Sequence, residues 1–346
     1  MQVNLDEIVH RGAISAQGYV TIGGEVFMAA SGVADISSRE PAPLNGYYRI
    51  GSTTKTFVAT VVLQLVDEGK LSLDDPLARH LPNLVTGNGY DDTAITVRHL
   101  LQHTSGIYDY NMDADWTPFE DQALFEARRF QQYGPVELLG IALGHRPKFL
   151  PGTAYSYANT NYIVVGLLIE AITGNHWSTE VEQRIIQPLN LAHTFIPIDV
   201  QLPEPHAKGY FQFEQHGMLV DVTDMDMSAG GAGGAIVSNL VDIAHFFTAL
   251  LGGELLSAEQ LAEMQATVPS GDERYGLGLG WTPLTCGGGY WRHGGAVPGY
   301  LSYEAFKNDS SVGVVLSVTG WGFDSANFAS DDAARKLIDN VSCDRK

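Results

Sequence analysis

The spacing of apolar positions changes along the chain and divides it into β-like and helical parts. Residues 1–50 read as strands, with two β-rich runs within residues 18–29 separated by two glycines, a pattern that favours a hairpin. From Ser52 the apolar side chains recur at helical spacing, and Gly69 stands where a helix C-cap belongs. This stretch predicts a buried helix of about four turns.

Helical signals dominate from there to about residue 268, and β-like runs return after it. The helical segments, separated by turn-rich stretches, cover residues 161–174, 178–189, 239–252 and 257–265. Three short β-like runs follow at residues 290–292, 300–306 and 312–318, and a last helix is predicted for residues 326–341.

Strands at both ends of the chain and helices between them indicate an α/β (α+β) fold. The simplest arrangement joins the terminal runs in one antiparallel five-stranded sheet flanked by helices, with an all-α lobe made by the insert. We therefore expect a discontinuous sheet domain of residues 1–51 and 269–346 and a mostly helical domain of residues 52–268. The active site is expected in the cleft between them, because such clefts are favoured ligand sites.

Composition and charge exclude several classes of protein. The 346 residues are 45% hydrophobic and 17% charged, enough for a substantial core, which excludes a disordered or fibrous chain. With 40 acidic against 20 basic side chains, the formal net charge is -20, so nucleic acid is not expected as a partner.

Membrane and export signals are weak in this sequence. No apolar run reaches the roughly 18 to 20 residues that a membrane span needs, and the first residues lack the basic and apolar blocks of a signal peptide. We expect a secreted or cell-envelope protein whose signal peptide was removed, with a cytoplasmic location as the alternative.

Two cysteines and one pair of histidines are the residues that could suggest a metal site. Cys286 and Cys343 are too few and too far apart for a zinc cage, and His99 and His103 are spaced i,i+4 without a third ligand at a characteristic distance. We expect no metal. The cysteines could instead form one disulfide, which would imply an oxidising compartment, or remain as two free thiols.

Ser52 and Lys55 are the first candidates for chemistry. Three residues apart on a helix, they share one face, so the ammonium can reach the hydroxyl. The helix N-terminus favours a developing oxyanion, and apolar surroundings would lower the lysine pKa toward that of a usable base. The alternative is a serine N-cap followed by a solvated lysine, and the spacing alone does not decide between them.

Two later segments add residues of the same chemistry. Tyr157 could relay protons and Asn159 could hold a substrate amide, just ahead of an apolar helix. His293 is followed by Gly294 and Gly295, small residues that a substrate backbone could approach closely. Each has a structural alternative: a buried aromatic ring, a helix N-cap and a core histidine. Each alternative is credible alone, but the three together are much less so.

On these residues the sequence resembles the serine β-lactamase and penicillin-binding-protein superfamily, in its class C branch. Similarity extends over nearly the whole chain, through residues 48–52, 64–71, 101–106, 157–159 and 275–279. The branch includes DD-peptidases, family VIII esterases and D-amino-acid amidases. The sequence is most similar to the soluble actinomycete D-alanyl-D-alanine carboxypeptidase/transpeptidases, whose two late cysteines match Cys286 and Cys343.

The resemblance implies a role for each residue. Ser52 would be the acylated nucleophile, Lys55 and Tyr157 the proton-transfer pair, and Asn159 a contact to the substrate amide. The backbone N–H groups of Ser52 and Ala296 would form the oxyanion hole. The implied reaction is two-step acyl transfer through an acyl-enzyme, without a cofactor, and with water or an amine as the second acceptor.

The sequence departs from the family where a substrate carboxylate is held. The family triplet is Lys or His, Thr or Ser, then Gly, often followed by Thr or Ser, whereas this chain reads His293-Gly294-Gly295-Ala296 without hydroxyls. An assisting cation of the most similar carboxypeptidases aligns with Gly280, and Arg292 should point to the opposite strand face. Each lost charge-assisted hydrogen bond is worth about 1.5 to 3 kcal/mol, so recognition of a terminal carboxylate should be weak.

Three functions follow as expectations. The first is a serine acyl hydrolase that acts through a Ser52 acyl-enzyme on D-amino-acid-containing peptides or amides. The second is a carboxylesterase or β-lactamase-like hydrolase of the same fold. The third is a non-catalytic sensor that binds penicillin or peptidoglycan. The expected partners are small peptides, amides or esters, with β-lactams as further candidates.

Overall fold

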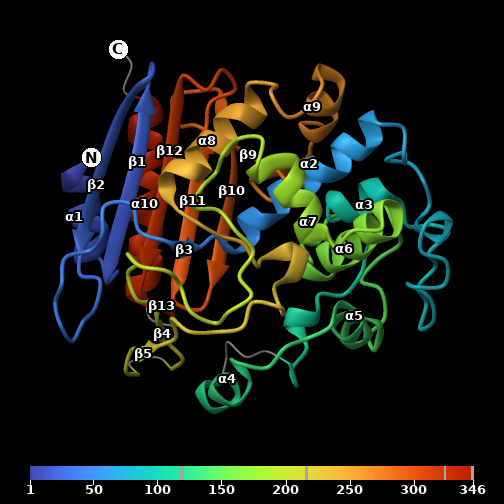
Figure 1. The fold of residues 1–346 in the computed structure, drawn as a ribbon, viewed down its shortest axis with the longest axis horizontal. Helices are drawn as coiled ribbons and strands as arrows, with labels where there is room; N and C mark the ends of the chain where they lie inside the picture. The colour runs from blue at the N-terminus through green and yellow to red at the C-terminus, as the bar shows by residue number, and fades with distance from the viewer. Residues whose placement is uncertain (117–120, 215–216, 323–324, 344–346) are drawn as a thin grey trace.

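The computed structural model of the chain describes residues 1–116, 121–214, 217–322 and 325–343. Its centre is an antiparallel sheet of eight strands, which occupies the left half of Figure 1. In spatial order the strands are β2 (Glu25–Gly32), β1 (Ser15–Ile22), β12 (Val312–Thr319), β11 (Tyr300–Phe306), β10 (Gly289–Val297), β9 (Gly280–Pro283), β8 (Glu273–Tyr275) and β7 (Val268–Ser270). Both ends of the chain therefore meet in one sheet.

The sheet confirms the expected antiparallel arrangement and enlarges it. The hairpin β1–β2 and the late strands β10, β11 and β12 are the five that the sequence predicted, and the turn glycines Gly23 and Gly24 have positive φ angles of 60° and 89°. The expected number of five was wrong, because β7, β8 and β9 extend the sheet to eight strands. Each has only three or four residues, too short for an alternating pattern to stand out.

Helices cover both faces of the sheet. On one face, α1 (Gln2–His10) packs against α10 (Ser325–Cys343), and on the other lie α8 (Leu240–Leu251) and the longer helix α2 (Thr54–Asp67). Strand β12 contributes to both faces, since Val314 and Leu316 join the core under α1 and α10 while Val315 joins the larger core.

The first helix was not predicted. Residues 2–10 form α1, although residues 1–50 read as strands in the sequence. Leu5 and Ile8 are its buried residues and lie one turn apart, but nine residues give too few repeats for a clear helical period.

The helices at residues 54–67, 159–173, 240–251 and 258–264 follow the predicted segments closely, whereas those at residues 97–101, 122–128 and 135–143 were not among the predicted segments. Helix α2 ends just before Gly69, whose φ of 70° suits the glycine after a C-cap. The other helices are α3 (Val97–Leu101), α4 (Gln122–Arg128), α5 (Pro135–Leu143), α6 (Asn159–Thr173), α7 (Trp177–Val181) and α9 (Ala258–Met264). All but α4, which lies at the lower end, are on the right of Figure 1. Where one helix had been predicted for residues 178–189, α7 continues into the π-helical turn Glu182–Ile186.

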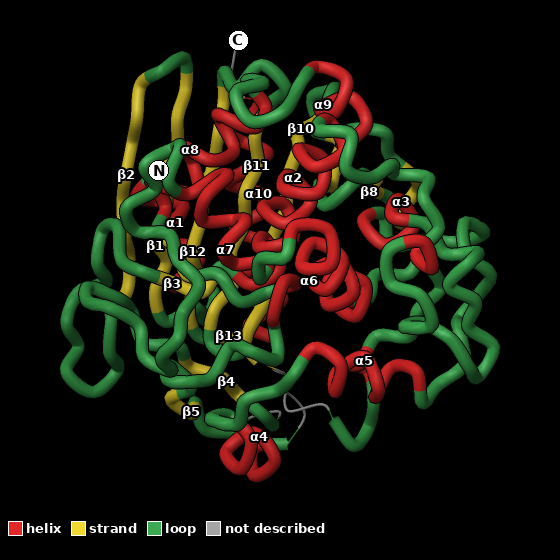
Figure 2. Tube along the Cα trace, turned by 45° about the vertical axis from the view of Figure 1, so that its right-hand side comes forward, coloured by secondary structure: helices red, strands yellow, loops and turns green. Residues whose placement is uncertain are grey.

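Small sheets and turns complete the chain. Strand β3 (Tyr48–Arg49) pairs with β6 (Val237–Ser238), and β4 (Tyr210–Gln212) pairs with β5 (Val220–Asp221) and β13 (Trp321–Gly322). The sheet of β4, β5 and β13 lies beside α4 at the lower end of the molecule, as Figures 1 and 2 both show.

The division into two domains stays a prediction. Helix α8 belongs by sequence to the helical part of residues 52–268, yet it packs on β12, β1 and β11. The larger hydrophobic core runs without a break from α2 and α6 into Phe306 and Val315 of the sheet. Residues 323–324 and 344–346 of the predicted sheet domain lie outside the described residues.

The two cysteines are joined. Cys286, in the turn between β9 and β10, forms a disulfide with Cys343 at the end of α10, with a Cα–Cα distance of 5.8 Å. The sequence had left this pairing open. The bridge fastens the end of the last helix to the turn between β9 and β10. In the described part of the chain, we find no helix both long and apolar enough for a bilayer crossing.

Candidate active site

Ser52 lies in the short 3-10 turn Gly51–Thr53, between β3 and α2. This turn presses against β10, and glycines make the approach possible. A Cβ on Gly295 would stand 1.8 Å from the carbonyl oxygen of Ile50, and a Cβ on Gly51 would stand 3.0 Å from the backbone nitrogen of Ala296. The turn that carries Ser52 and the small-residue strand therefore meet, and the N–H of Ala296 lies beside this turn.

Lys55 is fully buried one turn further along. Its Nζ donates to Ser52 Oγ at 3.0 Å, Asn159 Oδ1 at 2.8 Å and the carbonyl oxygen of Gly233 at 2.7 Å. Burial lowers the pKa of Lys55 to about 7, and the nearby Asp109 carboxylate acts in the opposite direction. A neutral amine keeps two N–H donors for Asn159 and Gly233 and can turn its lone pair to Ser52. The site therefore holds a base that is partly deprotonated at neutral pH.

Tyr157 lies on the same side of the nucleophile and is also buried. Its phenol is within hydrogen-bonding reach of Ser52, and burial raises its pKa far above the ordinary value. The Lys55 ammonium stands 4.9 Å from the centre of the Tyr157 ring. Tyr157 therefore stays protonated where Lys55 titrates, and the pair can divide proton uptake and proton release between them.

Asn159 is the first residue of α6, and both ends of its amide are engaged. While Oδ1 accepts from Lys55, Nδ2 donates to Asp109 Oδ2 at 3.0 Å. Asp109 Oδ1 in turn accepts the N–H of Asn111 at 3.3 Å. The amide is thus held in one orientation, with its second N–H left for a substrate carbonyl. Sequence reasoning missed Asp109, because its loop has no periodic pattern and joins the site only through the fold.

His293 is buried on β10 and serves as a neutral hydrogen-bonding group. Its Nε2 lies 2.9 Å from the hydroxyl of Tyr275, which sequence reasoning had not singled out. Burial and the positive charge of Lys55 lower the pKa of His293 to about 3. His293 therefore cannot supply the cation that a lysine would provide at this place.

The candidate metal ligands His99 and His103 each have a local hydrogen bond. His99 Nδ1 accepts the N–H of Thr96 in the cap of α3, and His103 Nδ1 accepts the N–H of Ala158. The His103 ring also packs at 4.2 Å, centre to centre, on the ring of Tyr157. These contacts place His103 behind Tyr157, where it supports the phenol.

Residues 293–297 of β10 have a free strand edge on one side. The pairing of β10 with β9 ends at Arg292, while its pairing with β11 continues to Val297. Among the described strands, none pairs with residues 293–297 on the side of β9. Gly294 and Gly295 lie in this segment, so a peptide-like substrate could run along the free edge and meet Ser52.

Arg292 precedes His293 on β10 and lines a cavity that Ser52 and His293 also border. It donates to Thr282 Oγ1 at 2.8 Å and forms an ion pair with Glu273, and it lies opposite Gly280 in the register. Adjacent residues of β10 face opposite sides of the strand, as the sequence predicted, but both Arg292 and His293 border this cavity. The guanidinium of Arg292 is already paired with a carboxylate.

Two cavities meet at Ser52 and Ala296. One has a volume of about 800 Å³ and is mostly apolar, with walls that include Tyr110, Trp116, Phe125, Tyr133, Met225 and Met227. The other, of about 940 Å³, lies across β10 and is lined by polar groups that include Tyr155, Tyr157, Glu273, Arg292, His293 and Arg335. The aromatic residues of the first cavity were not identified from the sequence, since they come from separate segments of the chain.

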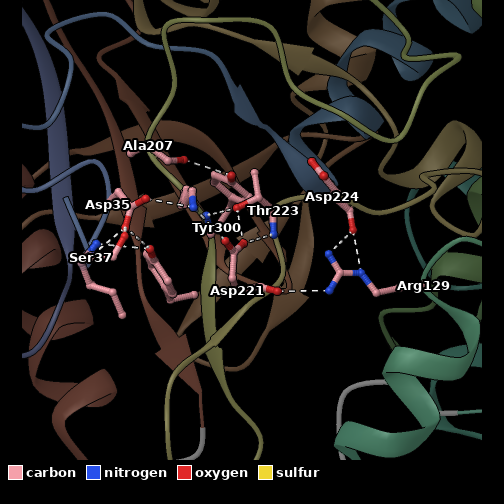
Figure 3. A network of polar contacts seen from close by, with 12 residues as sticks. Asp35, Ser37, Arg129, Ala207, Asp221, Thr223, Asp224 and Tyr300 are labelled. Atoms are coloured by element: carbon pink, nitrogen blue, oxygen red, sulfur yellow. Dashed lines mark hydrogen bonds and ion pairs between the residues drawn. The ribbon is translucent and has the colours of Figure 1, made fainter. Parts of the chain in front are cut away.

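A polar network fixes one wall of the apolar cavity (Figure 3). Arg129, at the end of α4, donates to the carbonyl oxygens of Asp224 at 2.8 Å and Asp221 at 3.1 Å, and its own carbonyl accepts the N–H of Asp226 at 2.7 Å. Arg49, on the strand before the nucleophile, donates to the carbonyl of Thr223 at 2.9 Å. The wall that carries Met225 and Met227 is therefore tied both to α4 and to the nucleophile strand.

Comparisons with known proteins place the chain in a family. A family model described as Beta-lactamase matches residues 4–337. Penicillin-binding protein 4 of Amycolatopsis lactamdurans is 29% identical over 344 residues, 93% of this chain and 84% of that protein. Across eight curated relatives, the chain spans between 32% and 84% of the relative's own length.

Solved structures resemble the whole chain. A D-stereospecific amidohydrolase from a Streptomyces species is 34% identical with a TM-score of 0.92, covering 100% of this chain and 98% of that one. The D-amino acid amidase of Ochrobactrum anthropi SV3, complexed with D-phenylalanine, is 25% identical with a TM-score of 0.86, covering 99% and 98%. The expected fold, an antiparallel sheet flanked by helices, is confirmed by both.

Proposed function

The chain belongs to the beta-lactamase family, and from this premise we propose that it is a serine hydrolase of D-amino acid amides acting through a Ser52 acyl-enzyme. The observation that carries the proposal is the contact between Ser52 and the buried Lys55. The lowered pKa of Lys55 provides a base at neutral pH, and Ser52, the proposed nucleophile, borders an apolar cavity.

In the acylation step, neutral Lys55 accepts the proton of Ser52 while Oγ attacks the substrate carbonyl carbon. The N–H groups of Ser52 and Ala296 hold the oxyanion that forms on the carbonyl oxygen. Tyr157 donates its proton to the leaving amine as the C–N bond breaks, and the proton on Lys55 restores the phenol. Water then attacks the ester carbon by the same route in reverse, which releases the acid and frees Ser52.

The apolar cavity is proposed to take the side chain of the acyl group. Trp116 is buried and contacts Tyr110 and Tyr133 edge to face, so the cavity presents aromatic surfaces at a short distance from the nucleophile. An aromatic substrate side chain would gain both burial and ring contacts there. D-phenylalanine amide is therefore the substrate of first choice, in line with the ligand bound by the Ochrobactrum amidase.

A free terminal carboxylate is not expected to be held well. His293 is uncharged at neutral pH, the small residues at 294–296 carry no hydroxyl, and Arg292 is paired with Glu273. We therefore propose amides and esters over D-alanyl-D-alanine peptides as substrates. The disulfide supports a secreted or cell-envelope location over a cytoplasmic one.

A substrate panel tests the function. We expect D-phenylalanine amide to be hydrolysed and its L-enantiomer to be a poor substrate, with little release of D-alanine from an acylated D-alanyl-D-alanine peptide. Intact mass after brief exposure to benzylpenicillin should show no stable adduct. Efficient carboxypeptidase activity, or a stable penicillin adduct on Ser52, would contradict the proposed substrate class. Turnover of esters alone would show a carboxylesterase.

Replacing Trp116 with alanine is expected to raise KM for D-phenylalanine amide about tenfold or more, because the cavity loses its largest aromatic wall. The same variant should handle D-alanine amide almost as well as the wild type does, since a methyl group does not reach that wall. The exposed neighbour Phe130, changed to alanine, is the control. An equal effect on both substrates would place the acyl side chain elsewhere.

Replacing Asp109 with asparagine is expected to move the acidic limb of the kcat/KM profile to lower pH. The Asp109 carboxylate raises the pKa of Lys55, and the neutral amide removes that charge while it can still accept from Asn159. The matched control is Asp113→Asn, in the same loop but bonded to His145. If both variants keep the acidic limb of the wild-type kcat/KM profile, Asp109 does not raise the pKa of Lys55.

A further inference from the structure

Glu304 is a buried acid that the proposed mechanism does not use. It lies on β11 and is 1% exposed, and within the described residues no basic group lies at ion-pair distance from it. Its Oε2 is 2.9 Å from Thr53 Oγ1, while Oε1 has no hydrogen-bond partner in the described part of the chain. An ionised carboxylate in such surroundings would be costly.

The contacts of Glu304 lead directly to the nucleophile turn. Thr53 follows Ser52 in sequence, and its hydroxyl lies 3.3 Å from Ser302 Oγ. Ser302 Oγ donates to the carbonyl of Ile50 at 3.3 Å, so β11 contacts the turn on both sides of Ser52. The same strand pairs with β10, where Ser302 lies opposite Gly295.

An un-ionised Glu304 completes this chain of contacts. Its acid proton can be donated to Thr53, the Thr53 hydroxyl to Ser302, and the Ser302 hydroxyl to the Ile50 carbonyl, so that each hydrogen in the series has an acceptor. All three side chains are almost completely buried. The series therefore connects β11 to the turn through buried hydroxyl groups.

We propose, on the basis of the proposed function, that Glu304 is a positioning residue. In its un-ionised form it ties the Gly51–Thr53 turn to β11 and so sets the spacing between the two N–H groups of the oxyanion hole. One of these groups, on Ser52, moves with the turn. The other, on Ala296, belongs to the strand next to β11.

The groups around Glu304 leave it un-ionised near neutral pH. On β10, His293 lies opposite and is neutral, and Arg292 favours ionisation only weakly from the other face. On β3, the buried Tyr48 hydroxyl is uncharged, and on α8 the Asp242 carboxylate is engaged by Thr194. Burial raises the pKa of Glu304 to about 8.

Ionisation of Glu304 would therefore act on catalysis at alkaline pH. A negative charge beside the turn would oppose the negative charge that develops on the carbonyl oxygen. We expect wild-type kcat to fall about fivefold between about pH 8 and pH 9 for this reason, with KM little changed. A group with only a structural role would not produce this fall in kcat at alkaline pH.

The test compares three variants on D-phenylalanine amide. Glu304→Gln is expected to keep kcat within about threefold near pH 7 and to lose the alkaline fall, since an amide can donate to Thr53 but cannot ionise. Glu304→Leu and Thr53→Val are expected to lower kcat about tenfold or more with KM almost unchanged. The control is Glu180→Gln. Glu180 is a buried glutamate of α7 that pairs with Arg184, and its variant should keep the wild-type pH profile of kcat.

An alkaline fall that persists in Glu304→Gln, or a wild-type kcat in Thr53→Val, would overturn the proposal. If Glu304→Leu does not fold, the other two variants carry the test.

A second readout does not depend on activity. The pKa of Glu304 in the folded protein lies above its ordinary value, so Glu304 stays protonated in the folded chain at pH values where it ionises in the unfolded chain. The stability of the wild type therefore falls as the pH rises toward about 8. The Tm of Glu304→Gln should therefore rise relative to the wild type between about pH 5.5 and pH 8. Should no amide or ester be hydrolysed, this shift still supports an un-ionised Glu304, and a constant Tm difference rejects it.

Discussion

Replacing Ser52 with alanine is expected to lower kcat/KM for D-phenylalanine amide by at least about 10⁴-fold and to abolish the acyl-enzyme. The hydroxyl is the only reacting atom that the substitution removes, and it lies on a turn whose backbone contacts with β10 do not involve the side chain. The fold should remain intact. Steady-state kinetics, together with intact mass after rapid quenching with an ester of D-phenylalanine, measures both effects.

The control for Ser52 is a serine near the cleft that the mechanism does not use. Ser156 accepts from Lys148 at 3.1 Å and is not part of either cavity wall, so Ser156→Ala should keep full activity. An unchanged rate in Ser52→Ala would show a different nucleophile and would end the acyl-enzyme proposal. Loss of activity with a persistent mass adduct would place the acyl group on another side chain.

Replacing Lys55 with methionine is expected to lower kcat by about 10³-fold, because Ser52 loses the base that accepts its proton. Arginine should not restore activity, since a guanidinium does not deprotonate in proteins. In the wild type, kcat/KM should fall as pH drops below about 7, because protonation of Lys55 fills the lone pair that the reaction needs. The pH profiles of wild type and Tyr157→Phe, measured side by side, show whether this acidic limb belongs to lysine.

Lys55 also has an expected effect on stability that is separate from catalysis. Its folded-state pKa of about 7 lies below the ordinary 10.5, so between these values the unfolded chain binds a proton that the folded chain does not. Stability should therefore rise with pH across this window by up to about 1.4 kcal/mol for each pH unit, and Lys55→Met should lose that rise. A wild-type stability without this slope would mean that Lys55 is charged in the folded state.

The parts of the molecule that sequence predicted well are those with long or local signals. The helix that begins after Ser52, the helices of residues 159–173 and 240–251, and the strands β11 and β12 repeat their apolar pattern over several periods, whereas only residues 290–292 of β10 were predicted. The contact between Ser52 and Lys55 was predictable because it spans a single turn. The short strands β7 to β9 and the helix α1 were missed, since few residues carry their pattern.

By itself, the sequence determined the family, the order of the candidate residues and the loss of hydroxyl groups at 294 and 296. Only the tertiary structure decided how those residues behave, since a pKa depends on burial and on charges that are remote in sequence. It is burial that gives Lys55 a pKa of about 7 and His293 a pKa of about 3. The aromatic cavity and the Glu304 contacts likewise bring together segments that lie far apart along the chain, and no local pattern records such proximity.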